Sequence, residues 1–280
     1  MRVAVLGTGL IGGSIGLAAR RAGAEVIGYD PDHDAVLRAL QLGAIDVRAP
    51  DIATAVGGAQ VVFAAAPVGA LAETVRQALA LAGPDCVLSD VGSTKLALQD
   101  ARRDPRFVGG HPLAGAETAG AAHARADLFA SCTWYLTPGP SVDQRLYERL
   151  AELIERFGAR PVAIAPDAHD RLMACVSQLP HVLANVLVTQ AATAFARERC
   201  QPRGGAGPSL RDATRVAGAN TAVWGDIYLA NRHALIAAID EAVGRLTEVR
   251  AALQAGDAQA ISTWNEQARA DRETLLGPAS

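Results

Sequence analysis

A glycine-rich turn near the start of the chain constrains the fold more than any other feature. The turn reads Gly-Thr-Gly-Leu-Ile-Gly at residues 7–12, with an apolar run before it and a helical pattern after it. In a strand-turn-helix unit of this kind, Gly7 permits the tight turn and Gly9 lets the backbone approach a pyrophosphate. Gly12 lets the helix pack closely on the sheet. The pattern therefore predicts a dinucleotide site.

The acid that ends the next apolar run, Asp30, indicates which dinucleotide is bound. A carboxylate at this place would hydrogen-bond the ribose 2′-hydroxyl and repel a 2′-phosphate, while the amino terminus of the helix attracts the pyrophosphate. The sequence therefore predicts NAD rather than NADP, and the alternative is a glycine turn that binds nothing. The expected cofactor-binding residues are Gly7, Gly9, Leu10, Ile11, Gly12 and Asp30.

Composition limits the classes of protein that remain. The chain has 280 residues, of which 50% are hydrophobic and 20% are charged, and its net charge is −3. A chain of this length can form two hydrophobic cores. The absence of a broad basic face argues against a nucleic-acid partner. The first residues continue directly into the glycine turn, so we expect no leader, no membrane span and a cytoplasmic protein. The four scattered cysteines predict buried free thiols and no metal site.

The rest of the chain divides into two patterns. Up to Ala165, short apolar runs alternate with helical stretches, which predicts an α/β, doubly wound, mostly parallel Rossmann-like sheet. From Pro166 onward the pattern is helical throughout. We therefore expect a dinucleotide-binding domain over 1–165 and an all-helical substrate and dimerisation domain over 166–280. Apolar residues on several helix faces favour a homodimer.

The expected strands lie at 3–6, 25–29, 61–65, 86–89, 107–109, 133–137 and 161–164, and the expected helices of the first domain lie at 11–21, 34–41, 69–81, 95–102 and 142–157.

Candidate chemical groups follow the ends of these strands, where α/β sheets bind their ligands. Ser93 lies in the loop 90–95, and His111 lies in the loop 110–115. A histidine beside a nicotinamide could accept the proton of a substrate hydroxyl while hydride leaves the same carbon. Lys95, the single lysine of the chain, has no role that the sequence fixes: it could neutralise a bound charge or be solvated.

Several motifs in order resemble the prephenate dehydrogenase family. They are the glycine turn, Asp-Val-Gly-Ser-Thr-Lys at 90–95, Gly-Gly-His-Pro-Leu-Ala-Gly at 109–115, Ser-x-Leu-Pro-His at 177–181 and Asp-x-Thr-Arg-Val-Ala at 212–217, followed by Trp224 and Asn231. The resemblance covers essentially the whole chain. It implies an NAD-dependent oxidative decarboxylation of prephenate to 4-hydroxyphenylpyruvate in tyrosine biosynthesis.

The same resemblance implies the roles of the site residues. His111 matches the catalytic histidine, and Ser93 matches a serine that holds the ring hydroxyl. Arg215 matches the arginine that anchors a substrate carboxylate, and His181 matches a histidine that lines the substrate pocket. Simpler roles stay open: Ser93 as a helix cap, Arg215 as a surface ion-pair residue and His181 as the mark of a helix kink.

One departure from the family pattern leaves the substrate open. Relatives often read Ser-His-Leu-Pro-His, whereas this chain has Gln178 after Ser177. Both residues are expected to bind substrate, but glutamine cannot become cationic, so arogenate or another amino-substituted analogue is an alternative to prephenate. A β-hydroxyacid dehydrogenase is a second alternative, and an NAD-bound sensor is the non-enzyme alternative.

Overall fold

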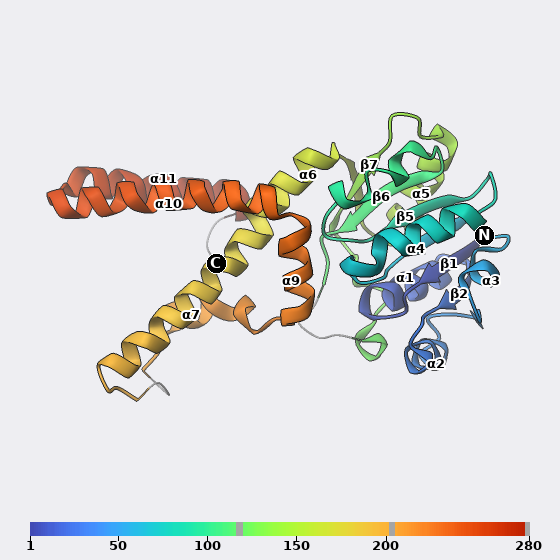
Figure 1. The fold of residues 1–280 in the computed structure, drawn as a ribbon, viewed down its shortest axis with the longest axis horizontal. Coiled ribbons are helices and arrows are strands. Elements are labelled where there is room, and N and C mark those ends of the chain that lie inside the picture. The colour runs from blue at the N-terminus through green and yellow to red at the C-terminus, as the bar shows by residue number, and fades with distance from the viewer. Residues whose placement is uncertain (116–119, 202–204, 278–280) are drawn as a thin grey trace. The chain divides into compact units, whose positions relative to one another are not determined.

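The computed structural model describes residues 1–115, 120–201 and 205–277. Two compact units make up the chain, residues 1–232 and residues 233–280. The larger unit contains a sheet and the helices that follow it, and the smaller unit contains the carboxyl-terminal helices (Figure 1).

An eight-stranded sheet in the order β3-β2-β1-β4-β5-β6-β7-β8 organises the larger unit. Its pairs are parallel except β6 with β7, which are antiparallel. The strand order reverses between β1 and β4, which is the place where doubly wound sheets bind dinucleotides. The strands are β1 Arg2–Leu6, β2 Glu25–Tyr29, β3 Val47–Arg48, β4 Val61–Ala64, β5 Val87–Asp90, β6 Phe107–Pro112, β7 Thr133–Pro138 and β8 Arg160–Ala163.

Helices cover both faces of the sheet because alternate strand residues point to opposite sides. Val3 and Val5 belong to one buried core, together with residues of α1 (Leu10–Arg21), α2 (His33–Gln41) and α5 (Gln144–Arg156). Ala4 and Leu6 belong to the other core, with residues of α3 (Ile52–Val56) and α4 (Val68–Leu81). The predicted doubly wound, mostly parallel fold is confirmed.

The part of the chain after the sheet is helical, and its described residues contain no further strand. In the larger unit it comprises α6 Pro166–Met173, a π-helical turn Ala174–Gln178, α7 Leu179–Arg197, α8 Pro208–Thr214, a 3₁₀ turn Arg215–Gly218 and α9 Thr221–Ala230. The smaller unit is built from α10 Arg232–Ala255 and α11 Ala258–Leu276. The predicted helical domain after the sheet is confirmed, whereas its boundary near Pro166 stays a prediction.

Several local predictions are wrong. The strand β3 and the helix α3 were not expected, and residues 95–102 form two 3₁₀ turns, Leu96–Leu98 and Ala101–Arg103, instead of one helix. The thiols are not all buried either: Cys86 is buried and Cys132 is half-buried, but Cys175 and Cys200 are exposed.

The expectation that no stretch could span a membrane also needs correction. Among the described residues, the helical stretch Pro166–Arg197 contains an 18-residue segment that is apolar enough, with a mean hydropathy of 1.5, and 28% of this segment is buried. A core helix of a soluble protein meets the same criteria. Polar side chains interrupt this stretch, and two of them, Gln178 and His181, make hydrogen bonds within the protein.

Candidate active site

The glycine turn has the backbone geometry that a dinucleotide site needs. Gly7 has a φ of 100°, and a Cβ there would lie 2.5 Å from the carbonyl oxygen of Ala65. A Cβ on Gly12 would lie 1.8 Å from the carbonyl oxygen of Gly7, so no larger residue fits. Gly9, in contrast, has open space beside it, and no side chain caps the amino terminus of α1. The first N–H groups of α1 are therefore available to an anion. Leu10 and Ile11 form the first turn of this helix.

Asp30 follows β2 and contacts the glycine turn directly. Its Oδ2 accepts hydrogen bonds from the backbone N–H of Thr8 at 2.6 Å and from the Thr8 hydroxyl at 3.2 Å, and its Oδ1 accepts one from the N–H of Asp32 at 2.9 Å. The carboxylate therefore links β2 to the turn. Its contact with a ribose stays a prediction.

A buried ion pair ties together the ends of β5 and β6. The Nζ of Lys95 donates to Asp90 Oδ2 and, at 2.7 Å, to the carbonyl oxygen of Gly110, while Asp90 Oδ1 accepts from the N–H of Gly110 at 3.0 Å. Lys95 is 1% exposed and Asp90 is fully buried. Burial lowers the pKa of Lys95, and the Asp90 carboxylate opposes that shift. Lys95 is therefore not solvated; it joins the end of β5, which leads into the loop with Ser93, to β6. The structure places His111 within β6 and not in a loop after the strand.

His111 lies at the end of β6, is partly exposed, and contacts a buried histidine, His169. Its Nδ1 lies 2.9 Å from Nε2 of His169, and Nδ1 of His169 lies 2.8 Å from Oδ1 of Asp170. Burial lowers the pKa of His111 well below its usual range, and the nearby His169 and Lys95 lower it further. His111 is therefore neutral near pH 7, the state that a proton acceptor requires. Sequence reasoning treated His169 and Asp170 as a structural pair at a helix start and missed their link to His111.

A cavity of about 410 Å³ brings four of the predicted site residues together. Ser93 and His111 line it from the sheet, and Ser177 and Gln178 line it from the π-helical turn. Its size is that of a small-molecule site. The other lining residues are Pro112, Leu113, Ala114, Gly115, Met173, Val176, Trp224 and Ile227.

Ser93 does not cap a helix. The 3₁₀ turn that follows it begins at Leu96 and has no side-chain cap. The N–H groups of Lys95 and Leu96 donate instead to the Asp170 carboxylate, at 2.8 and 2.9 Å. The loop that carries Ser93 is therefore fastened to α6.

The π-helical turn explains how the helical side presents its polar residues. Pro180 has no N–H to donate to the preceding turn, and its ring would clash with the carbonyl of Val176 in a regular helix, so the helix widens just before it. Gln178 at the end of this turn is buried, and its Oε1 accepts from the side-chain amide of Asn231 at 2.9 Å. The same amide donates to the carbonyl oxygen of Asp170 at 2.8 Å.

His181 and Arg215 are not among the residues that line this cavity in the described part of the chain. His181 stacks on Trp224, with ring centroids 3.8 Å apart and an angle of 4° between the planes, and its Nδ1 forms a hydrogen bond with the hydroxyl of Tyr228. Burial lowers the pKa of His181. His181 therefore packs against Trp224, which lines the cavity. Arg215 begins the 3₁₀ turn that packs against α7, and its side chain is exposed. Their contacts with substrate stay predictions.

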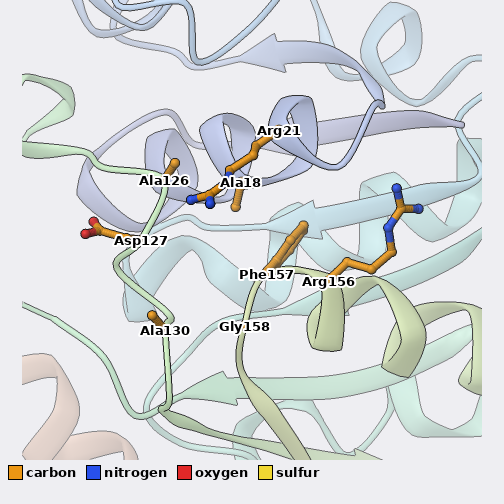
Figure 2. A pocket seen from close by; sticks show the side chains of 8 residues that line it. All are labelled: Ala18, Arg21, Ala126, Asp127, Ala130, Arg156, Phe157 and Gly158. Carbon is orange, nitrogen blue, oxygen red and sulfur yellow. The ribbon is translucent and has the colours of Figure 1, made fainter.

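A second cavity of about 210 Å³ lies beside α1 and the end of α5 (Figure 2). None of the predicted site residues lines it. The side chains of Arg21 and Arg156 point in different directions there (Figure 2). Arg156 donates to the carbonyl oxygen of Ala22. These polar groups do not converge on one ligand position, so we assign no function to this cavity.

Comparison with known proteins decides the family. Residues 15–163 match the model of the nucleotide-binding domain of prephenate dehydrogenase, and residues 165–267 match the model of its dimerization domain. The chain belongs to the prephenate dehydrogenase family. The resemblance predicted from the motifs is therefore confirmed, and the β-hydroxyacid dehydrogenase alternative is set aside.

Individual members of the family agree with this assignment. Prephenate dehydrogenase of Bacillus subtilis is 33% identical over 98% of this chain and 76% of its own length. Cyclohexadienyl dehydrogenase of Zymomonas mobilis is 31% identical over 91% of this chain and 89% of its own length. The crystal structure of prephenate dehydrogenase from Aquifex aeolicus in complex with hydroxyphenyl propionate and NAD+ superposes with a TM-score of 0.90 at 26% identity, and covers 98% of both chains.

Proposed function

We propose that this enzyme catalyses the NAD-dependent oxidative decarboxylation of prephenate to 4-hydroxyphenylpyruvate. The observation that carries the proposal is the 410 Å³ cavity, in which a histidine of lowered pKa lies at a strand end opposite polar residues of a helix. The open glycine turn with its uncapped helix fits a dinucleotide, and NAD, when bound, supplies the acceptor for hydride. Asp30 at the end of β2 favours NAD over NADP.

His111 is the proton acceptor in this mechanism. Its neutral imidazole takes the proton of the ring hydroxyl, whose oxygen Ser93 holds by a hydrogen bond. The carbon that bears the hydroxyl loses hydride and becomes a carbonyl conjugated with the ring. The carboxylate on the opposite ring carbon then leaves as carbon dioxide, and the electron pair of the broken bond moves through the ring to the carbonyl oxygen, which takes the proton back from His111 as the ring becomes aromatic. The protein has to position these groups, and His111 has to accept one proton and return it.

The helical side of the cavity supports a keto acid as the substrate. The Oε1 of Gln178 is engaged by Asn231, which leaves the amide N–H groups of Gln178 as donors for a ligand. A keto oxygen or a carboxylate accepts such donors, whereas the ammonium of arogenate does not. We infer that Ser177 and Gln178 contact the substrate side chain, that Arg215 anchors a carboxylate, and that His181 acts through Trp224.

We further propose that the enzyme works as a homodimer in the cytoplasm. The match to a dimerization domain supports the dimer, and so do the exposed apolar residues Leu183, Val186 and Leu187, which lie on one side of α7, and Val188 beside them. Burial of these side chains against a second copy would remove apolar surface from water.

The decisive experiment follows NADH absorbance when the full chain is mixed with NAD and either prephenate or arogenate. We expect a higher kcat/KM with prephenate than with arogenate, and little turnover when NADP replaces NAD. A higher kcat/KM with arogenate would overturn the substrate assignment. Binding of NAD without turnover of either compound would support the sensor.

A further inference from the structure

Two buried residues in the middle of α6 form a series of hydrogen bonds that ends on His111. His169 Nε2 lies 2.9 Å from His111 Nδ1, and His169 Nδ1 lies 2.8 Å from Asp170 Oδ1. His169 is fully buried and Asp170 is 1% exposed. Neither residue lines the cavity among the described residues, so neither reaches a ligand there. Any effect of the two on the reaction must pass through His111.

The hydrogen-bond donors around Asp170 establish which atom donates and which accepts in each of these hydrogen bonds. Its Oδ1 accepts from the N–H of Lys95 at 2.8 Å, and its Oδ2 accepts from the N–H of Leu96 at 2.9 Å. Both oxygens therefore act as acceptors, which is the pattern of an ionised carboxylate. The nitrogen that faces this carboxylate, Nδ1 of His169, must then be the donor.

Because Nδ1 of His169 is the donor to Asp170, the nitrogen that carries the hydrogen can be assigned on each histidine. A neutral imidazole carries one N–H, so Nε2 of His169 is an acceptor. The nitrogen that faces it, Nδ1 of His111, must donate. The remaining nitrogen of His111, Nε2, is then left with its lone pair, and His111 lines the cavity.

We propose that His169 and Asp170 are positioning residues that hold His111 in the tautomer whose Nε2 accepts the substrate proton. The inference rests on the proposed role of His111 as proton acceptor. In the opposite tautomer, Nε2 would carry a hydrogen and could not act as a base. When the substrate proton moves to Nε2, the Nδ1–H of His111 keeps its acceptor on His169, and the negative charge of Asp170 stabilises the imidazolium.

The surroundings of the histidine pair fit this role. The ring of Tyr135 meets His169 edge to face, with centroids 5.7 Å apart and an angle of 81°, which restricts rotation of the imidazole. The nearby cation, Lys95, is held in an ion pair with Asp90. Asn231 donates to the carbonyl oxygen of Asp170 and fastens the middle of α6 to the end of α9. The orientation of His169 is therefore fixed from several sides.

A pair of variants at His169 separates a positioning role from a structural one. His169→Gln keeps both an acceptor and a donor, so it can still accept from His111 and donate to Asp170. His169→Leu has a similar volume but neither group. We expect His169→Leu to lower kcat about 10²-fold with little change in KM, and His169→Gln to retain kcat within about 10-fold. Equal loss of kcat in the two folded variants would overturn the proposal.

Nitrogen NMR of the full, ligand-free chain labelled at histidine provides a readout that does not depend on activity. His111→Asn assigns the His111 signals. We expect a protonated Nδ1 and an unprotonated Nε2 on His111 above pH 7 in the unmodified protein. A protonated Nε2 there would overturn the proposal, even if His169→Leu did not fold. The expected tautomer in a protein that turns over neither prephenate nor arogenate would leave this inference standing and refute the proposed function instead.

Discussion

The cavity has two walls that are held in place by different forces. The strand-end wall, Ser93 and His111, is anchored by the buried Lys95–Asp90 pair beneath it. The helical wall, Ser177, Gln178 and Trp224, is anchored by neutral contacts: the amide pair of Gln178 with Asn231 and the stack of Trp224 on His181. Breaking a buried ion pair costs more than breaking a neutral hydrogen bond. The strand-end wall is therefore suited to fix the reacting groups, and the helical wall to adapt to the substrate side chain.

The largest effect should come from the strand-end wall. His111→Asn removes the proton acceptor, so we expect kcat to fall by about 10²- to 10⁴-fold while NAD affinity stays unchanged. Steady-state kinetics and a titration with NAD measure the two quantities. Loss of NAD binding in a folded variant would show that His111 supports the cofactor site instead of the chemistry.

The anchor of the same wall should dominate stability. Lys95→Met leaves the Asp90 carboxylate buried without its cation, so we expect the free energy of unfolding to fall by about 3–5 kcal/mol. Denaturant unfolding measures this change. Arg76→Met, which removes an exposed ion pair with Glu73, is the matched control and should leave the midpoint unchanged. Similar midpoints for the two variants would contradict the anchoring role.

On the helical side, Arg215→Ala should act on substrate affinity. Loss of a charge-assisted hydrogen bond to a substrate carboxylate is expected to raise KM about 10- to 10²-fold, with a smaller change in kcat. Initial rates over a range of prephenate concentrations separate the two. If NAD affinity falls instead, Arg215 does not belong to the substrate site.

Gln178 should give the smallest and most selective effect. Gln178→Glu keeps an acceptor for Asn231 but replaces the amide donor with a carboxylate. We expect kcat/KM for prephenate to fall about 10-fold and the ratio of arogenate to prephenate activity to rise. Asn231→Leu, which removes the partner amide, is the companion variant. An unchanged ratio of arogenate to prephenate activity in Gln178→Glu would mean that Gln178 does not discriminate between the side chains of the two substrates.

A feature could be predicted from the sequence where it depends on neighbouring residues, and not where it depends on tertiary packing. The glycine turn and the longer strands have a recognisable local sequence pattern, whereas the two-residue strand β3 is too short to have one. Ser93 and His111 were predictable because parallel strands end at one edge of the sheet. No local pattern reveals a hydrogen bond between His111 and His169, which are 58 positions apart, or the stack that places His181 behind Trp224. These depend on tertiary packing.

The pH dependence of kcat/KM tests most directly the central claim that His111 is the proton acceptor. This quantity reports the ionisation of the free enzyme. Because burial, His169 and Lys95 lower the pKa of His111 below 6.5, activity should be constant above pH 6.5 and fall only at lower pH, as the imidazole becomes protonated. In His111→Asn the residual activity should lack this acid limb. A midpoint at or above pH 6.5, or the same limb in His111→Asn, would contradict the account.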